Sequence, residues 1–398
     1  MRTSLLPIVY AYPHCHWDMP PARQRYLTTA LSAYTSVYYL DCPVEMNRHE
    51  IARRPRAERI SDSLTVIRDA FGLRSSRLGQ RCRILSGAID AAWLHSLLQR
   101  EGVNEYIYWL GAPDSSLLPG MKQRHLIYDC IDPCFIAEHQ AQYDREEGAI
   151  ARRANLVFCT AETLLDRCKQ FNTNSFLLPN ACSPDEYLPE RNEAVPRPAA
   201  LEGRSGPVIG FMGTIDWRLD VDTLYAAALA LPQFTFAVVG RISNLEQGLR
   251  IGALGALPNV VVTGAVSLEE GRAYTAAFDV GLIPFLPGPM CDAVNPVKMY
   301  MYLAAGKPVV STWLHECARY APLVYATQTP QDFIQAIYTA VEEARCDTQL
   351  TRKRIAFAKN NTWDERARTA ASHLHAQFPS PNHTSWDLIK NAAVKRTL

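Results

Sequence analysis

The stretch at residues 292–312, which reads DAVNPVKMYMYLAAGKPVVST, limits the possible folds of this chain more than any other. An Asn-Pro pair is typical of a helix start, and the apolar residues after it follow at helical spacing. Gly306 then ends the helix, and the apolar run Pro308–Ser311 indicates a buried strand. We therefore predict a helix that leads directly into a strand of a parallel sheet, as in α/β proteins.

Lys298 lies in the first turn of this predicted helix. The free N–H groups and the positive dipole end of a helix N-terminus favour an anion, and a lysine there suits a diphosphate. A lysine on an ordinary strand–helix unit can equally be a surface residue. The rest of the chain has to decide between these two interpretations.

Several further segments, taken in chain order, decide between these two interpretations, because they resemble segments of a known family. Together with residues 292–312 they resemble glycosyltransferases of group 1 (family 4-like), and in particular bacterial teichuronic-acid and exopolysaccharide glucuronosyltransferases. The matching segments are NLVFCT at 155–160, LLPNA at 177–181, FMGTIDW at 211–217 and NVVVTGAV and AAFDVGLIPF within 259–285. The resemblance implies an α/β protein with the GT-B fold: two facing Rossmann-like domains with an interdomain cleft and a C-terminal crossover helix.

Length and composition agree with a folded protein of two domains. The chain has 398 residues, which exceeds one typical core, and its apolar and charged contents are 48% and 20%. The formal net charge of +1 gives no global field that would recruit nucleic acid. We expect a Rossmann-like acceptor-binding domain over 1–182, a linker over 183–206, a nucleotide-sugar donor domain over 207–360, a helix over 361–376 that packs back on the first domain, and a tail over 377–398.

The eleven cysteines are scattered, without a CxxC pair or the Cys/His spacing of a zinc site. We therefore expect buried free thiols, with no metal and no cofactor beyond the nucleotide-sugar co-substrate. The N-terminal apolar run is expected to be a first strand rather than a signal peptide, and no apolar run reaches membrane-spanning length. These features predict a cytoplasmic protein that meets a membrane only peripherally, at the inner face of the plasma membrane.

Polar residues follow two predicted strands of the first domain. His14 and His16 come after the apolar run Leu5–Tyr12, and Asp129 and Asp132 stand at the end of the predicted strand His125–Cys130. Ligands of open α/β sheets bind at the carboxyl ends of strands, so all four are candidate site residues. Each histidine can also be an ordinary loop residue.

Asp132 is the candidate general base. In the exopolysaccharide glucuronosyltransferases an aspartate at the matching position has this role, and an acceptor hydroxyl must lose a proton as it attacks the sugar. Pro133 keeps Asp132 extended, which leaves its carboxylate free to face a ligand. Two alternatives remain: Asp132 caps the following helix, or Asp129, His14 or His16 acts as the base instead.

The donor site is expected at the start of the second domain and around the 292–312 stretch. Backbone N–H groups at Gly213-Thr214, between a strand and a helix predicted at 221–231, can bind phosphate. Lys298 and Asn295 would complete the diphosphate end. The resemblance further places the nucleobase near Arg241 and Val266, and Arg241 can also reach a phosphate.

Two departures from the related retaining enzymes bear on the stereochemistry. Those enzymes have a glutamate on the donor helix where this chain has Met301, and they have an arginine and a lysine where Thr214 and Leu219 stand here. The missing phosphate clamp favours the inverting class that uses a carboxylate base. It also leaves an inactive, sugar-nucleotide-binding protein as an alternative.

Residues 48–83 contain ten arginines and only four acidic residues. This region can face anionic lipid headgroups or a lipid-diphosphate acceptor, or it can be a solvated insertion. We predict an inverting glycosyltransferase that moves a sugar from a UDP-sugar to a hydroxyl of a glycan or polyprenyl-diphosphate glycan in surface polysaccharide synthesis. A nucleotide-sugar 2-epimerase of the same fold is the alternative reaction.

Overall fold

The computed structural model describes residues 5–12, 15–41, 54–75, 81–114, 125–135, 137–188, 195–346 and 348–378. His14, parts of the arginine-rich region and nearly all of the tail predicted for 377–398 lie outside the described residues. The predictions made for them stay predictions.

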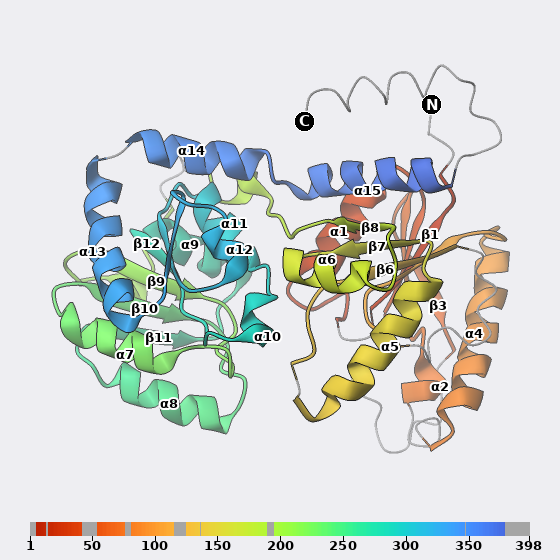
Figure 1. The fold of residues 1–398 in the computed structure, drawn as a ribbon, viewed down its shortest axis with the longest axis horizontal. Helices are drawn as coiled ribbons and strands as arrows, with labels where there is room; N and C mark the ends of the chain where they lie inside the picture. The colour runs from red at the N-terminus through yellow and green to blue at the C-terminus, as the bar shows by residue number, and fades with distance from the viewer. Residues whose placement is uncertain are drawn as a thin grey trace.

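An eight-stranded sheet forms the first half of the chain, with strand order β3-β4-β2-β1-β5-β6-β7-β8 (Figure 1). Neighbouring strands are parallel except for β3 and β4, which form an antiparallel hairpin at one edge. The strands are β1 (Ile8–Ala11), β2 (Val37–Leu40), β3 (Arg56–Ser61), β4 (Leu64–Arg68), β5 (Ile107–Leu110), β6 (His125–Cys130), β7 (Leu156–Cys159) and β8 (Ser175–Leu177). Almost every residue of β1, β2, β5, β6 and β7 is buried, as expected for strands covered on both faces.

Successive residues of these strands contribute to two cores on opposite faces of the sheet. Val9 packs against α4 (Arg83–Arg100), α5 (Gln140–Arg153) and α6 (Glu162–Lys169), whereas Tyr10 packs against α1 (Arg23–Leu31) and α15 (Trp363–Gln377). The side-chain alternation of a strand explains this division. The first half is therefore a three-layer α/β/α structure.

A six-stranded parallel sheet with the order β11-β10-β9-β12-β13-β14 forms the second half. Its strands are β9 (Val208–Met212), β10 (Thr235–Val239), β11 (Val260–Gly264), β12 (Val280–Ile283), β13 (Val309–Thr312) and β14 (Val324–Thr327). Its helices are α7 (Val221–Ala230), α8 (Leu245–Gly255), α9 (Leu268–Ala277), α10 (Pro289–Asp292), α11 (Val297–Ala304), α12 (His315–Ala318) and α13 (Pro330–Cys346). The short elements elsewhere are α2 (Gly72–Ser75), η2 (Ala137–His139), η3 (Pro184–Glu186) and η4 (Ala199–Leu201).

The stretch from 292 to 312 folds as its sequence indicates. α11 begins after the Asn-Pro pair, and Gly306 adopts a positive φ of 73° just beyond its end. A residue with a side chain would be strained in that conformation, so glycine terminates the helix there. β13 follows directly, displaced by one residue from the predicted strand.

A crossover at the C-terminal end ties the halves together, as predicted (Figure 1). α14 (Thr348–Lys359) packs on α11 of the second half, and α15 packs on α1 of the first. The ring of Trp363, at the start of α15, stacks on Tyr26 of α1 with centroids 5.6 Å apart. The side chain of Thr362 caps α15 by accepting a hydrogen bond from the Glu365 N–H, so the helix starts where it meets the first half.

A buried hydrogen-bonded joint also connects the two sheets. The backbone N–H of Asn180 donates to Oδ1 of Asn295 at 3.0 Å, and the Asn180 amide donates to the Asn295 carbonyl at 2.7 Å. The carboxylate of Glu316 accepts from the Asn295 amide and from the backbone N–H of Glu162, both at 2.9 Å. This joint fixes the start of α11 relative to the first half. Throughout the described part of the chain, each helix is too short or too polar to cross a membrane.

Candidate active site

The glycine turn after β9 is built by close backbone contact. Gly213 and Gly240 follow neighbouring strands, with φ of 150° and 142°. A Cβ on Gly240 would lie 1.9 Å from the carbonyl oxygen of Gly213, and a Cβ on Gly213 would lie 3.1 Å from Cε of Lys298. Only glycine allows this packing, and the packing brings Lys298 of α11 onto the end of β9.

The first backbone N–H group of this turn is engaged within the protein. The N–H of Gly213 donates to the Val239 carbonyl at 2.9 Å and is not available to a ligand. α7 begins only at Val221, and the carboxylate of Asp220 already caps its N-terminus. Thr214 is exposed in the intervening loop. The N-terminus of α11, in contrast, has no side-chain cap.

Lys298 is a cation without an anionic partner of its own. Its Nζ lies 4.4 Å from the centre of the Phe285 ring and 5.2 Å from that of Phe211. Among the residues that the structure describes, none forms an ion pair or hydrogen bond with this ammonium. Burial, reinforced by the charge of Arg218, lowers the pKa of Lys298 to about 7, although Asp216 opposes the shift. A bound anion would stabilise the protonated form in this position.

Arg218 is the site residue that the sequence reasoning missed. It lies in the loop between β9 and α7, where Asp216 pairs with its guanidinium through two carboxylate oxygens. The guanidinium stacks over Phe285 at 5.5 Å and over Phe135 of the first half at 5.4 Å. The missing phosphate clamp was inferred from Thr214 and Leu219, but an arginine stands one residue before Leu219. A cation therefore stands in this loop, although Thr214 and Leu219 do not supply one.

Asp132 lies in the loop after β6 of the first half, near Arg218. It is half-buried, and burial raises the pKa of its carboxyl, although the charges of Arg218 and Arg23 act to lower it. The prediction that it caps the next helix is wrong for α5, because His139 occupies that N-cap position. The carbonyl of Asp132 accepts a hydrogen bond from Tyr143 at 2.7 Å, which holds the loop on α5.

The two alternatives to Asp132 that the structure describes, Asp129 and His16, have other partners. Asp129 is fully buried, and Arg23 donates to both of its oxygens, at 2.9 and 3.2 Å. Such a pair fixes β6 to α1 and leaves the carboxylate little freedom to accept a proton. Nδ1 of His16 lies 3.6 Å from the carboxylate of Asp41, which also binds Arg68. The structure thus places Asp129 in an ion pair with Arg23, and His16 beside the ion pair of Asp41 with Arg68.

The remaining predicted donor residues differ in their surroundings. Arg241 is exposed and directly follows Gly240, so its side chain is free to reach a ligand at this edge. Val266 and Met301 are half-buried against the second core. Asn295 is a correction, because its amide oxygen and nitrogen are both hydrogen-bonded in the interdomain joint. We assign it to the joint and not to the donor.

Known proteins resemble this chain in sequence and in fold. Residues 206–343 match the family model for Glycosyl transferases group 1. The chain is 29% identical over 273 residues to the teichuronic acid biosynthesis glycosyltransferase TuaH of Bacillus subtilis (strain 168), covering 64% of this chain and 68% of that relative.

Two solved structures are similar in fold. Sucrose-phosphate synthase from Thermosynechococcus elongatus superposes with a TM-score of 0.71 at 16% identity, covering 94% of this chain and 99% of that one. A structure from E. coli described as trehalose-6-phosphate bound with UDP-2-fluoro glucose gives 0.70 at 13% identity, covering 94% and 100%. At such identities the likeness concerns the fold alone.

Proposed function

Since this chain is a glycosyltransferase with a group 1 domain in the GT-B fold, we propose that it transfers a sugar from a UDP-sugar to a hydroxyl of a glycan acceptor. The proposed acceptor is a lipid-linked glycan in surface polysaccharide synthesis. Asp132 is the proposed general base, and the transfer proceeds with inversion.

One observation supports this reaction most strongly: Arg218, which lies beside Lys298 of α11, also acts on the carboxylate of Asp132 from the other sheet. Lys298 and Arg218 share the Phe285 ring. Arg218 also reaches across to Phe135, and its charge acts on Asp132. A diphosphate between the cations and an acceptor hydroxyl beside the carboxylate would meet at a single place.

The chemistry follows from these positions. As the glycosidic bond to the diphosphate breaks, negative charge develops on the leaving oxygen, and Lys298, Arg218 and the first turn of α11 stabilise that charge. Asp132 accepts the proton of the attacking hydroxyl. Burial has raised its pKa, which brings the carboxylate closer to the range where a general base is effective.

The proposed substrates are inferred from the proteins that this chain resembles. The E. coli structure binds UDP-2-fluoro glucose, which supports UDP as the donor nucleotide. TuaH is named for teichuronic acid biosynthesis, which supports a surface glycan as the acceptor. Arg56 and Arg59 are exposed on the edge strand β3, and we place this part of the arginine-rich region against anionic lipid at the inner membrane face.

The test is a turnover screen. UDP-sugars and GDP-sugars are incubated with the protein and lipid-linked or free glycan acceptors, and release of the nucleoside diphosphate is measured. We expect release with a UDP-sugar, and NMR of the product should show an inverted anomeric centre. Release only with GDP-sugars would overturn the donor, and a retained anomeric centre would overturn Asp132 as the base. Isomerisation of a UDP-sugar without acceptor would favour the epimerase instead.

A further inference from the structure

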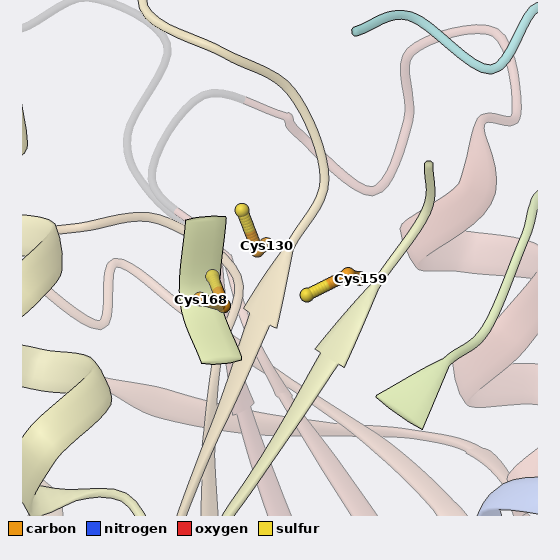
Figure 2. Close-up of side chains that lie close together, drawn as sticks. All are labelled: Cys130, Cys159 and Cys168. Carbon is orange, nitrogen blue, oxygen red and sulfur yellow. The ribbon is translucent and has the colours of Figure 1, made fainter. Parts of the chain in front are cut away.

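Three cysteines that are far apart in the sequence meet inside the first half. Cys130 ends β6 and Cys159 ends β7, and the two strands pair in parallel with these residues directly opposite each other. Cys168 lies on α6, which covers that face of the sheet. Their sulfur atoms all lie within 4.8 Å of one another, and each residue is fully buried (Figure 2).

We propose that Cys130, Cys159 and Cys168 bind one thiophilic divalent metal ion, with zinc as the natural occupant. Sulfur atoms that share a zinc ion lie about 3.8 Å apart, because each Zn–S bond is about 2.3 Å long. The observed spacing therefore permits ligation after side-chain movements of about 1 Å or less. Thiolates are the ligands that such ions prefer.

Two polar neighbours complete the surroundings of the cluster. Oε1 of Glu147 lies 3.3 Å from the sulfur of Cys130, and Nη2 of Arg167 lies 3.9 Å from the same atom. Arg167 also donates to Glu147 at 2.9 Å, and Tyr128 donates to the same carboxylate oxygen at 3.0 Å. Glu147 thus lies beside one sulfur of the cluster as an outer-shell partner, and hydrogen bonds from Arg167 and Tyr128 hold it in place.

The charges favour a divalent ion over a monovalent one. Three thiolates and the Glu147 carboxylate carry four negative charges, and Arg167 supplies one positive charge. A divalent ion leaves one negative charge unbalanced in a buried site, whereas copper(I) leaves two. Unbalanced buried charge is costly, so the divalent ion is the better occupant.

The location gives the site a structural role. The cluster joins the ends of two strands to a helix, and Cys130 lies two residues before Asp132. Since the sulfur atoms are closed off from solvent, the ion would be acquired as the chain folds. The ion would then fix the strand end that carries Asp132.

The test measures metal in the full-length protein. The chain is expressed in medium supplemented with zinc or cobalt(II) and purified under reducing conditions, and its metal content is determined by mass spectrometry. We expect one ion per chain, with the intense visible bands of thiolate-bound tetrahedral cobalt in the second preparation. Folded wild-type protein with all eleven thiols reduced and no bound metal would overturn the proposal.

Variants locate the site. Cys168→Ser should lose the metal, whereas Cys182→Ser, which alters a buried thiol outside the cluster, should keep it. Glu147→Gln should weaken binding by roughly 10–100-fold while the cobalt bands persist. Equal metal content in Cys168→Ser and Cys182→Ser would contradict the site, as would copper(I) binding without zinc binding. If Cys168→Ser does not fold, the wild-type measurement still decides.

Discussion

Two basic residues, one in each half of the molecule, have opposite surroundings. Arg23 is almost fully buried, and Asp129 neutralises it through a two-point ion pair. Lys298 is held between aromatic rings and repelled by Arg218, with no ion pair to any described residue. The fold neutralises the first cation, whereas the second has no such partner among the described residues. A cation thus has a structural role in one half, and we propose a binding role for the cation in the other.

Breaking the satisfied pair should have the largest effect on stability. Asp129→Ala leaves the Arg23 charge buried and unpaired, and we expect a loss of about 3–5 kcal/mol in the free energy of unfolding. Denaturant unfolding monitored by circular dichroism measures it. Lys298→Met is the matched control, because removing a cation that lacks a partner should leave stability equal or higher. A stability loss for Lys298→Met as large as that for Asp129→Ala would contradict the comparison.

Asp132→Asn tests the carboxylate that we propose to act on substrate. The amide cannot accept the acceptor's proton, so kcat should fall roughly 10²–10⁴-fold while UDP affinity is kept. Single-turnover kinetics and calorimetry separate the two quantities. Asp144→Asn, on the exposed face of α5, serves as the control and should behave as wild type. Normal turnover by Asp132→Asn would show that another group is the base.

Arg218→Ala tests the missed cation. Loss of a charged hydrogen bond to the diphosphate should weaken UDP binding by about 1.5–3 kcal/mol. Since Arg218 also lowers the pKa of Lys298, the lysine pKa should rise in the variant. Calorimetry gives the affinity, and a pH series gives the pKa. UDP binding unchanged by this substitution would support the prediction from the sequence that the phosphate clamp of the retaining enzymes is missing.

The pH dependence follows from the pKa of Lys298, which is about 7 in the folded protein against an ordinary value of 10.5. The diphosphate binds the protonated lysine, so UDP affinity should be flat just below pH 7 and fall up to tenfold per pH unit above it. Lys298→Arg should abolish this dependence, because arginine stays charged. A flat wild-type profile from pH 7 to 9 would contradict the lowered pKa.

Stability should show the opposite trend with pH. Between pH 7 and 10.5 the unfolded chain holds the Lys298 proton and the folded chain does not. The contribution of Lys298 to the free energy of unfolding therefore rises with pH across that window and is unfavourable below it. The difference between wild type and Lys298→Met in denaturant unfolding should shrink from pH 7 to pH 10.

The sequence predicted the second half well because its signals are local. An Asn-Pro helix start, a glycine with positive φ and an apolar strand lie within one short stretch, and α11, Gly306 and β13 follow them. The resemblance of these segments to a known family implied the GT-B fold and the crossover helix. Arg218, one position before Leu219, was missed because its ring contacts, Phe285 and Phe135, lie in other segments.

The first half was harder to predict because its polar residues are organised by distant contacts. The pairing of Asp129 with Arg23, and of Asp41 with Arg68 beside His16, joins residues from separate elements. The three-cysteine cluster likewise depends on strand pairing between β6 and β7, which no Cys spacing reveals. Asn295 was misassigned because its partners, Asn180 and Glu316, lie in other segments.

Calorimetric titration of UDP into wild type, Lys298→Ala and the exposed control Arg345→Ala tests the central claim most directly. That claim is that Lys298, which has no ion pair with any described residue, binds the donor diphosphate. We expect tight binding to wild type and to Arg345→Ala, and a loss of about 1.5–3 kcal/mol for Lys298→Ala. Equal binding by all three proteins, or no UDP binding by folded wild type, would contradict the claim.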